Sequence, residues 1–174
     1  MNIFKKFIII FSLITFYPSM LMADTPFFLD FKYILNKSDA GAKAQTFLRN
    51  KLESGIKDIQ SKEKNILSEE KKLIQQKKII SADEYKKQVT ELRVKVSSLR
   101  KQRQTLIDSV SKQRVKARNE LLKNLNPIIK TYMAEKKIRM VVDKKSLLLA
   151  DENLNITKDI IALLNKKLKS IKLN

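Results

Sequence analysis

The chain has 174 residues, with 37 Lys or Arg against 18 Asp or Glu, so its formal net charge is +19. It has no cysteine, no histidine and only two glycines. This inventory excludes disulfide bonds, the usual zinc sets, Cys–His nucleophile pairs and glycine-rich phosphate loops, and it argues against an enzyme. A charge this large creates a field that attracts acidic polymers, anionic lipid surfaces or acidic unfolded proteins.

Residues 1–23 have the parts of a secretory signal peptide: two early lysines, an apolar run over 7–17, and a cleavage site that ends at Ala23. The alternative is an uncleaved membrane anchor, but the run is short for a span and Pro18 interrupts it. We therefore predict cleavage between Ala23 and Asp24. For a bacterial-type sequence, export of this kind places the mature chain in the periplasm, where no ATP is expected.

Residues 24–41 are expected to belong to a small body. The aromatic and aliphatic run over 27–35 is typical of a buried strand. Ser38 is placed to cap the helix that follows. Nothing nearby can pair with this strand, so its partners are expected in residues 127–174, on the far side of the central stretch.

Residues 42–126 predict two long helices folded back on each other. In the first half one apolar residue recurs every seventh position, at Leu52, Ile59, Ile66, Leu73 and Ile80. In the second half apolar residues follow the steps of four and three of a heptad seam, at Tyr85, Val89, Leu92, Val96, Leu99, Leu106, Val110 and Ala117. At 1.5 Å per residue such helices span about 60 Å, so the hairpin should project from the body as an arm.

The tip of this hairpin is expected near residues 79–84, where Ser81 and Glu84 form an S-x-x-E capping box. A reversal at this point pairs residues whose numbers sum to about 165. This register places two polar interruptions of the seam, Glu63 and Arg103, opposite each other. We predict an ion pair between them that fixes the register and contributes about 0.5 kcal/mol.

The surface of the hairpin is basic, with 22 Lys or Arg and 10 Asp or Glu between residues 42 and 126. Candidate client-binding bases occur in adjacent pairs: Lys71, Lys72, Lys77, Lys78, Lys86 and Lys87. Candidate apolar contacts lie off the seam, at Leu67, Ile74, Val94, Ile107 and Val115. The alternative for the lysines is an ordinary solvated helix face, and for the apolar residues it is cover by neighbouring lysine stems.

The region after the hairpin is expected to complete the body. Pro127 should kink or restart the returning helix, which would continue to about Lys136. Apolar runs over 138–142 and 147–150 predict two strands, and Thr157 is placed to cap a last, amphipathic helix. Three short strands and one helix are too small to bury a core well alone, so self-association is expected.

Short motifs at the two ends of the chain occur in a specific order. The opening has Phe28-Leu29-Asp30-Phe31 and then Ser38-Asp39-Ala40-Gly41; the closing part has Val141-Val142-Asp143, Leu149-Ala150 and Asn155-Ile156-Thr157. This arrangement around a basic hairpin resembles the Skp/OmpH family of periplasmic chaperones. The sequence departs from the family at Asn155, where Asp is usual, and at Pro127. The resemblance implies an α+β trimer with a small β-rich body and three coiled-coil arms around a cavity.

The same resemblance implies a holdase that binds unfolded outer-membrane β-barrel proteins without ATP, with lipopolysaccharide or another anionic lipid surface as a further partner. From the residue inventory we expect no catalytic residue, cofactor or metal. Two other interpretations stay open: a basic coiled-coil adaptor for a folded envelope protein, and a non-specific polyanion or nucleic-acid binder. Export and the scarcity of aromatic residues on the hairpin argue against specific nucleic-acid binding.

Overall fold

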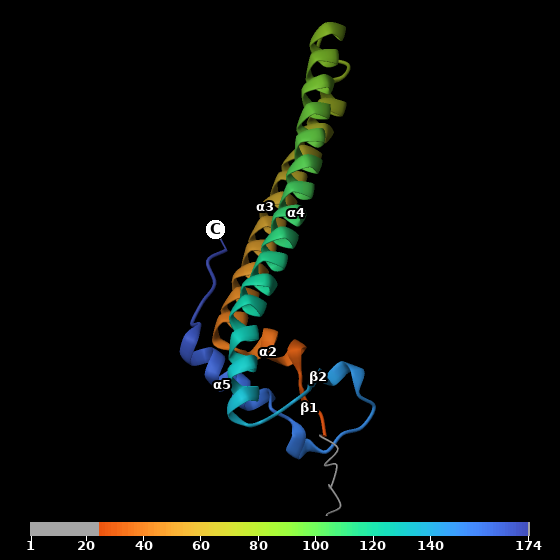
Figure 1. Cartoon of the computed structure of the whole chain (residues 1–174). Helices are drawn as coiled ribbons and strands as arrows, with labels where there is room; N and C mark the ends of the chain where they lie inside the picture. The colour runs from red at the N-terminus through yellow and green to blue at the C-terminus, as the bar shows by residue number, and fades with distance from the viewer. Residues whose placement is uncertain (1–24, 174) are drawn as a thin grey trace, which may run out of the picture.

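The computed structural model describes residues 25–173, so the predicted signal peptide and its cleavage site lie outside the described residues. Its elements in chain order are β1 (Phe27–Leu29), α2 (Phe31–Lys37), α3 (Asp39–Gln76), α4 (Ala82–Glu135), β2 (Val141–Asp143), the 3-10 helices η1 (Lys144–Ser146) and η2 (Glu152–Leu154), and α5 (Thr157–Lys167). Helices α3 and α4 project together from a small body, and the C-terminal residues run from α5 back beside the lower part of these two helices (Figure 1). Between residues 25 and 173, no helix is long and apolar enough to cross a membrane.

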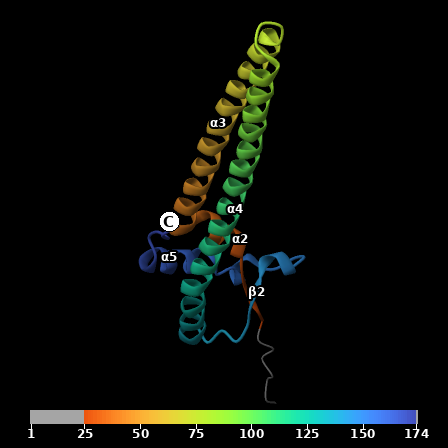
Figure 2. The same ribbon diagram turned by 90° about the horizontal axis from the view of Figure 1, so that it is seen from above.

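The projecting pair, which we call the arm, consists of the 38 residues of α3 and most of the 54 residues of α4. The chain rises along α3, turns over residues 77–81 and returns along α4, as both views show (Figures 1 and 2). The expected seam residues lie between the helices, and five of them are buried: Ile59, Leu73, Leu99, Val110 and Ala117. A two-helix seam leaves the remaining seam positions half-buried, since each is covered only by the partner helix.

Two of the three predicted N-caps, Ser38 and Ser81, are present. Ser38 Oγ accepts a hydrogen bond from the amide of Gly41, and Ser81 Oγ accepts one from the amide of Glu84, each at 3.2 Å. The second half of the capping box at the tip is wrong. Within the described chain the Glu84 carboxylate is bonded to Gln88 Nε2 at 2.8 Å rather than to the amide of Ser81.

The body is built around a two-stranded parallel sheet in which β1 pairs with β2. Phe27 lies opposite Val141 and Leu29 lies opposite Asp143. The core below the arm combines α2, the start of α3, the lower part of α4 and α5, with Ile34, Ala40, Leu125, Ile160 and Leu164 as its most buried members. Helix α4 therefore forms half of the arm and also contributes to the core of the body.

A hydrogen bond on the body joins α4 to α5. Tyr132 Oη donates to Asp159 Oδ2 at 2.6 Å. This bond, with smaller contributions from burial and from the charge of Asp159, raises the pKa of Tyr132 to about 12.

The strand predicted over 27–35 is correct only as far as Leu29. The following residues form α2, because Asp30 caps a helix there: its Oδ1 accepts from the amide of Tyr33 at 2.7 Å. Phe31, Ile34 and Leu35 then share one face, which packs on the core. The sequence carried this signal, an Asp before apolar residues at helical spacing.

The strand predicted over 147–150 is also wrong, and the strand predicted over 138–142 begins only at Val141. After β2 the Asp143 side chain accepts from the amide of Lys145, and the chain turns through η1 away from the sheet. Leu148 and Leu149 are 97% and 91% exposed. The described body thus contains two short strands, not three, and presents apolar residues to solvent.

Two expectations about helix ends are corrected. The restart at Pro127 is wrong, since α4 continues through it to Glu135. Thr157 is the first residue of α5 and does not cap it. Its Oγ1 accepts from the amide of Asp30 at 2.8 Å and donates to Asn155 Oδ1 at 2.6 Å, so this hydroxyl ties α5 to the end of β1.

Residues 168–173, which we call the strap, run from α5 back to the base of the arm. Leu173 is 3% exposed and belongs to a small apolar cluster with Ala44, Leu48, Val110 and Ala117. Gln113 Nε2 donates to the carbonyl oxygen of Leu173, and its Oε1 accepts from Lys51 Nζ. The strap and Lys51 of α3 thus each give the polar Gln113 one partner at the edge of an apolar seam.

We expect Gly41→Ala to destabilise the protein by about 1–3 kcal/mol, because a Cβ would overlap the backbone carbonyl oxygen of Leu35, which is fixed at the α2–α3 junction. In an open helix position the same change would stabilise by roughly 1 kcal/mol. Urea unfolding followed by circular dichroism measures the difference. Ala42→Gly at the neighbouring exposed position is the control, and a Gly41→Ala protein as stable as the parent would contradict the packing described.

Candidate functional site

The five off-seam apolar residues of the arm are all exposed. The exposed fraction is 55% for Leu67, 61% for Ile74 and 50% for Ile107, and it is similar for Val94 and Val115. They therefore do not contribute to the seam. Because single exposed apolar residues are common, their arrangement on the arm decides whether they form a surface.

Leu67, Ile74 and Ile107 lie on one side of the seam, along two adjoining grooves of about 500 and 610 Å³. Ile66, Glu70, Val96 and Arg100 line both grooves, which are therefore continuous. We call this side of the arm the arginine face. Its charged residues are Arg93, Arg100 and Arg103 with Glu63 and Glu70.

The other side of the seam, which we call the lysine face, has a different composition. Its grooves are lined by Lys51, Lys62, Lys72, Lys87, Lys95 and Lys101, by three glutamates, and by polar residues such as Ser98 and Gln102. Val94 lines a groove of about 390 Å³ on this face, so the structure separates it from Leu67 and Ile107.

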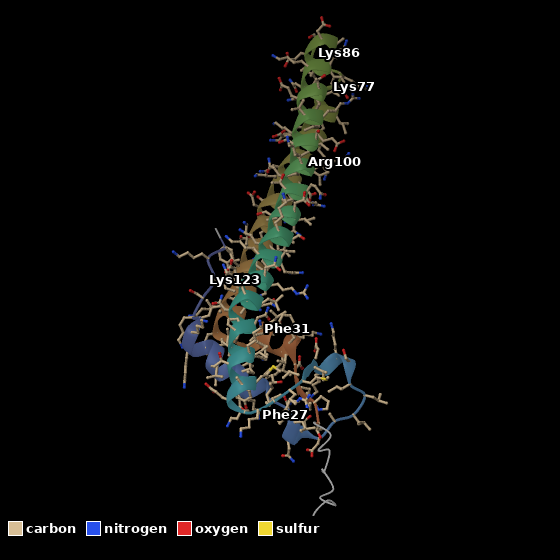
Figure 3. All side chains as sticks on the ribbon, in the orientation of Figure 1. Phe27, Phe31, Lys77, Lys86, Arg100 and Lys123 are labelled. Carbon is tan, nitrogen blue, oxygen red and sulfur yellow. The ribbon has the colours of Figure 1, made fainter. Side chains whose placement is uncertain are left out.

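The paired lysines lie along the upper part of the arm. Lys72 and Lys87 share a groove with Glu69, Glu84 and Glu91, and Lys77 Nζ lies 5.9 Å from the centre of the Tyr85 ring. The side chains of Lys71, Lys78 and Lys86 are exposed. Figure 3 shows Lys77 and Lys86 near the tip and Arg100 farther down the arm.

The side-chain pairs across the arm follow the expected register. Arg103 Nη2 lies 2.6 Å from Glu63 Oε1, so the ion pair derived from the sequence is present. Other cross-helix pairs have residue numbers that also sum to within one of 165: Lys51–Gln113, Lys62–Gln102 and Glu69–Lys95. Among the described residues, no group of three His, Cys, Asp or Glu side chains could hold a metal ion.

A comparison with protein families matches residues 27–164 to the family described as outer membrane protein (OmpH-like). The chain belongs to the OmpH-like family. The match covers the arm and most of the body, and it confirms the resemblance found in the motifs at the two ends. The strap lies outside the matched residues.

Solved structures support the OmpH-like fold. The crystal structure of an OmpH-like outer membrane chaperone from Caulobacter crescentus CB15 superposes with a TM-score of 0.78. The aligned region covers 85% of this chain and 89% of that one, at 19% sequence identity, so the likeness concerns the fold. No curated protein gives a significant match.

Sequence reasoning found the exposed residues of this OmpH-like arm but missed the difference between its two sides. The off-seam positions follow directly from the heptad pattern. Assigning each to a side requires both helices to be placed in register, since each face takes residues from α3 and α4. The register, in which paired residue numbers sum to about 165, contains that information.

We expect a double-mutant cycle of Glu63→Gln and Arg103→Gln to give a coupling energy of about 0.5 kcal/mol, because both side chains are roughly half exposed. Urea unfolding at low salt measures it, and the coupling should shrink at high salt. The cycle of Glu69→Gln and Lys95→Gln, an equally exposed pair, is the matched control. No coupling between Glu63 and Arg103 at low salt would show that this pair does not stabilise the register.

Proposed function

We propose that the protein is a periplasmic holdase chaperone, which binds unfolded outer-membrane β-barrel proteins without ATP and prevents their aggregation before assembly. The observation that carries the proposal is the arm, where exposed Leu67, Ile74 and Ile107 lie among basic residues on a scaffold of the OmpH-like family. The description of the Caulobacter protein as an outer membrane chaperone supports the same role.

The proposed mechanism separates capture from retention. The basic residues along the arm would raise the rate at which acidic unfolded chains arrive, by long-range attraction. Once a client is on the arm, dispersed apolar contacts would hold it. A long surface of individually weak contacts suits clients of different sequence, and release needs no ATP if the folded client no longer exposes the matching groups.

We further propose that three chains associate through their bodies and enclose a cavity between their arms. Met140, Leu148 and Leu149 are exposed apolar residues on a body whose own core is small. Contact between bodies would cover these three apolar residues. Contact between arms would instead bury the arm surface that is proposed to bind clients. The export of this trimer to the periplasm is proposed from the signal sequence of residues 1–23.

We expect the mature protein, added without ATP, to suppress the light scattering of a porin diluted from urea, because the arm covers apolar segments that otherwise associate. The assay needs the chaperone in excess over the client. A compact basic protein of similar net charge, with no exposed apolar arm, is the control for charge alone. Undiminished porin aggregation at that excess would refute the holdase proposal.

We expect light scattering after size exclusion to give a molar mass near three times that of one mature chain. Leu148→Asp with Leu149→Asp should shift the mass toward one chain, because charge at the contact opposes association. Ile79→Asp, at a largely exposed position near the tip, should leave the mass unchanged. A parent protein that is monomeric at micromolar concentration would remove the cavity from the proposal.

A further inference from the structure

The two faces of the arm differ in chemistry, and we infer that the arginine face is the contact surface for clients. We infer also that its ligand is an extended segment in which apolar or aromatic residues alternate with carboxylates. This inference rests on the proposed function and assigns it to one side of the arm. The inference follows from the guanidinium groups of Arg93 and Arg100, from the exposed apolar residues and from the dimensions of that side.

Three of the six lysines that line the lysine face, Lys51, Lys62 and Lys95, have partners within the arm. Lys95 Nζ lies 2.6 Å from Glu69, Lys62 Nζ contacts Asp58 at 2.7 Å and Gln102 at 2.9 Å, and Lys51 Nζ contacts Ser109 and Gln113 at 3.0 Å. On the arginine face, Glu63 neutralises Arg103, but neither Arg93 nor Arg100 has an ion-pair partner within residues 25–173. These two guanidinium groups are available to an incoming carboxylate.

Apolar contact area is also concentrated on the arginine face. Leu67, Ile74 and Ile107 are each at least half exposed there and line continuous grooves, whereas Val94 is the exposed aliphatic residue of the lysine-face grooves. An arginine beside an aliphatic groove can pair with a carboxylate and also stack its planar guanidinium on an aromatic ring. The lysine face instead suits long-range attraction, because ammonium groups stay strongly hydrated.

The dimensions of the arginine face fit a strand. In the register of the arm, Ile107 lies level with residue 58 of α3, so Ile74 and Ile107 are about 24 Å apart along the axis. About seven residues of extended chain cover that distance. Arg93 and Arg100 lie between these ends, level with residues 72 and 65. Strands of outer-membrane barrels alternate apolar and polar residues over about ten positions, with aromatic residues near their ends, which is the pattern this face would accept.

The test compares matched double variants that change one face at a time. Leu67→Asn with Ile74→Asn removes apolar contacts from the arginine face, and Arg93→Gln with Arg100→Gln removes its free charge. The controls are Tyr33→Asn with Phe47→Asn, which are exposed apolar residues outside both faces, and Lys62→Gln with Lys101→Gln on the lysine face. Circular dichroism and urea unfolding check that each variant folds, as expected for exposed positions.

Binding is measured by fluorescence anisotropy with a labelled peptide of about nine residues in which Phe alternates with Asp, and with a urea-unfolded porin. We expect either arginine-face variant to weaken peptide binding about tenfold and each control variant to stay within about twofold. A peptide with Lys in place of Asp should bind the parent protein about tenfold more weakly than the Asp peptide.

Equal losses from the two faces, or a larger loss from the lysine-face variant, would overturn the assignment. The failure of this inference is distinguishable from that of the proposed function. If the parent protein suppresses porin aggregation and the arginine-face variants do so equally well, only the assignment fails. If the parent protein neither binds porin nor suppresses its aggregation, the proposed function fails.

Discussion

The packing of α3 against α4 in a single register is the constraint on which the rest of the structure depends. Strands β1 and β2 pair only because α4 returns the chain to the level at which α3 left it. A slip of one heptad would displace β2 by about 10 Å and remove Leu125 from the core. The Glu63–Arg103 pair opposes such a slip, because a seam shifted by one heptad would place Glu63 against Val96 or Val110.

The same seam creates the two different faces. Two helices cover each other along one line only, so grooves remain on both sides of it and share the seam residues Ile66 and Leu99 as their floor. The side chains on either side of the seam then determine whether each groove is lined mainly by aliphatic or by charged residues. On one side three lysines, Lys51, Lys62 and Lys95, have acidic or amide partners within the arm. On the other side the aliphatic side chains of Leu67, Ile74 and Ile107 are exposed. A chain with net charge far from zero can keep such a surface in solution without self-association of the arms.

The features that could be predicted from the sequence are those that depend on local or repeating signals. The heptad rows, the caps at Ser38 and Ser81, the Glu63–Arg103 pair and the exposure of the off-seam residues all follow from spacing. Most of the errors lie in the body, where some partners are distant: Thr157 bonds to the amide of Asp30, 127 residues earlier. The run over 147–150 has strand composition but no edge to pair with, because η1 turns the chain away from β2. Composition alone predicts neither the Thr157–Asp30 hydrogen bond nor the turn of the chain at η1.

The base of a long arm on a small body is where bending would be expected. The strap adds packing and polar contacts at this base. Ile171 packs against both the body core and the apolar cluster at the arm base. The strap therefore connects these two clusters, which are also connected by α3 and α4. Lys169 adds a contact to Asp39 at 3.2 Å, beside the start of α3. Gln113, which interrupts the seam, binds the carbonyl oxygen of Leu173 and so has a structural role there. Gln113 interrupts the apolar seam at one position, and its hydrogen bond to Leu173 holds the strap at the junction of arm and body.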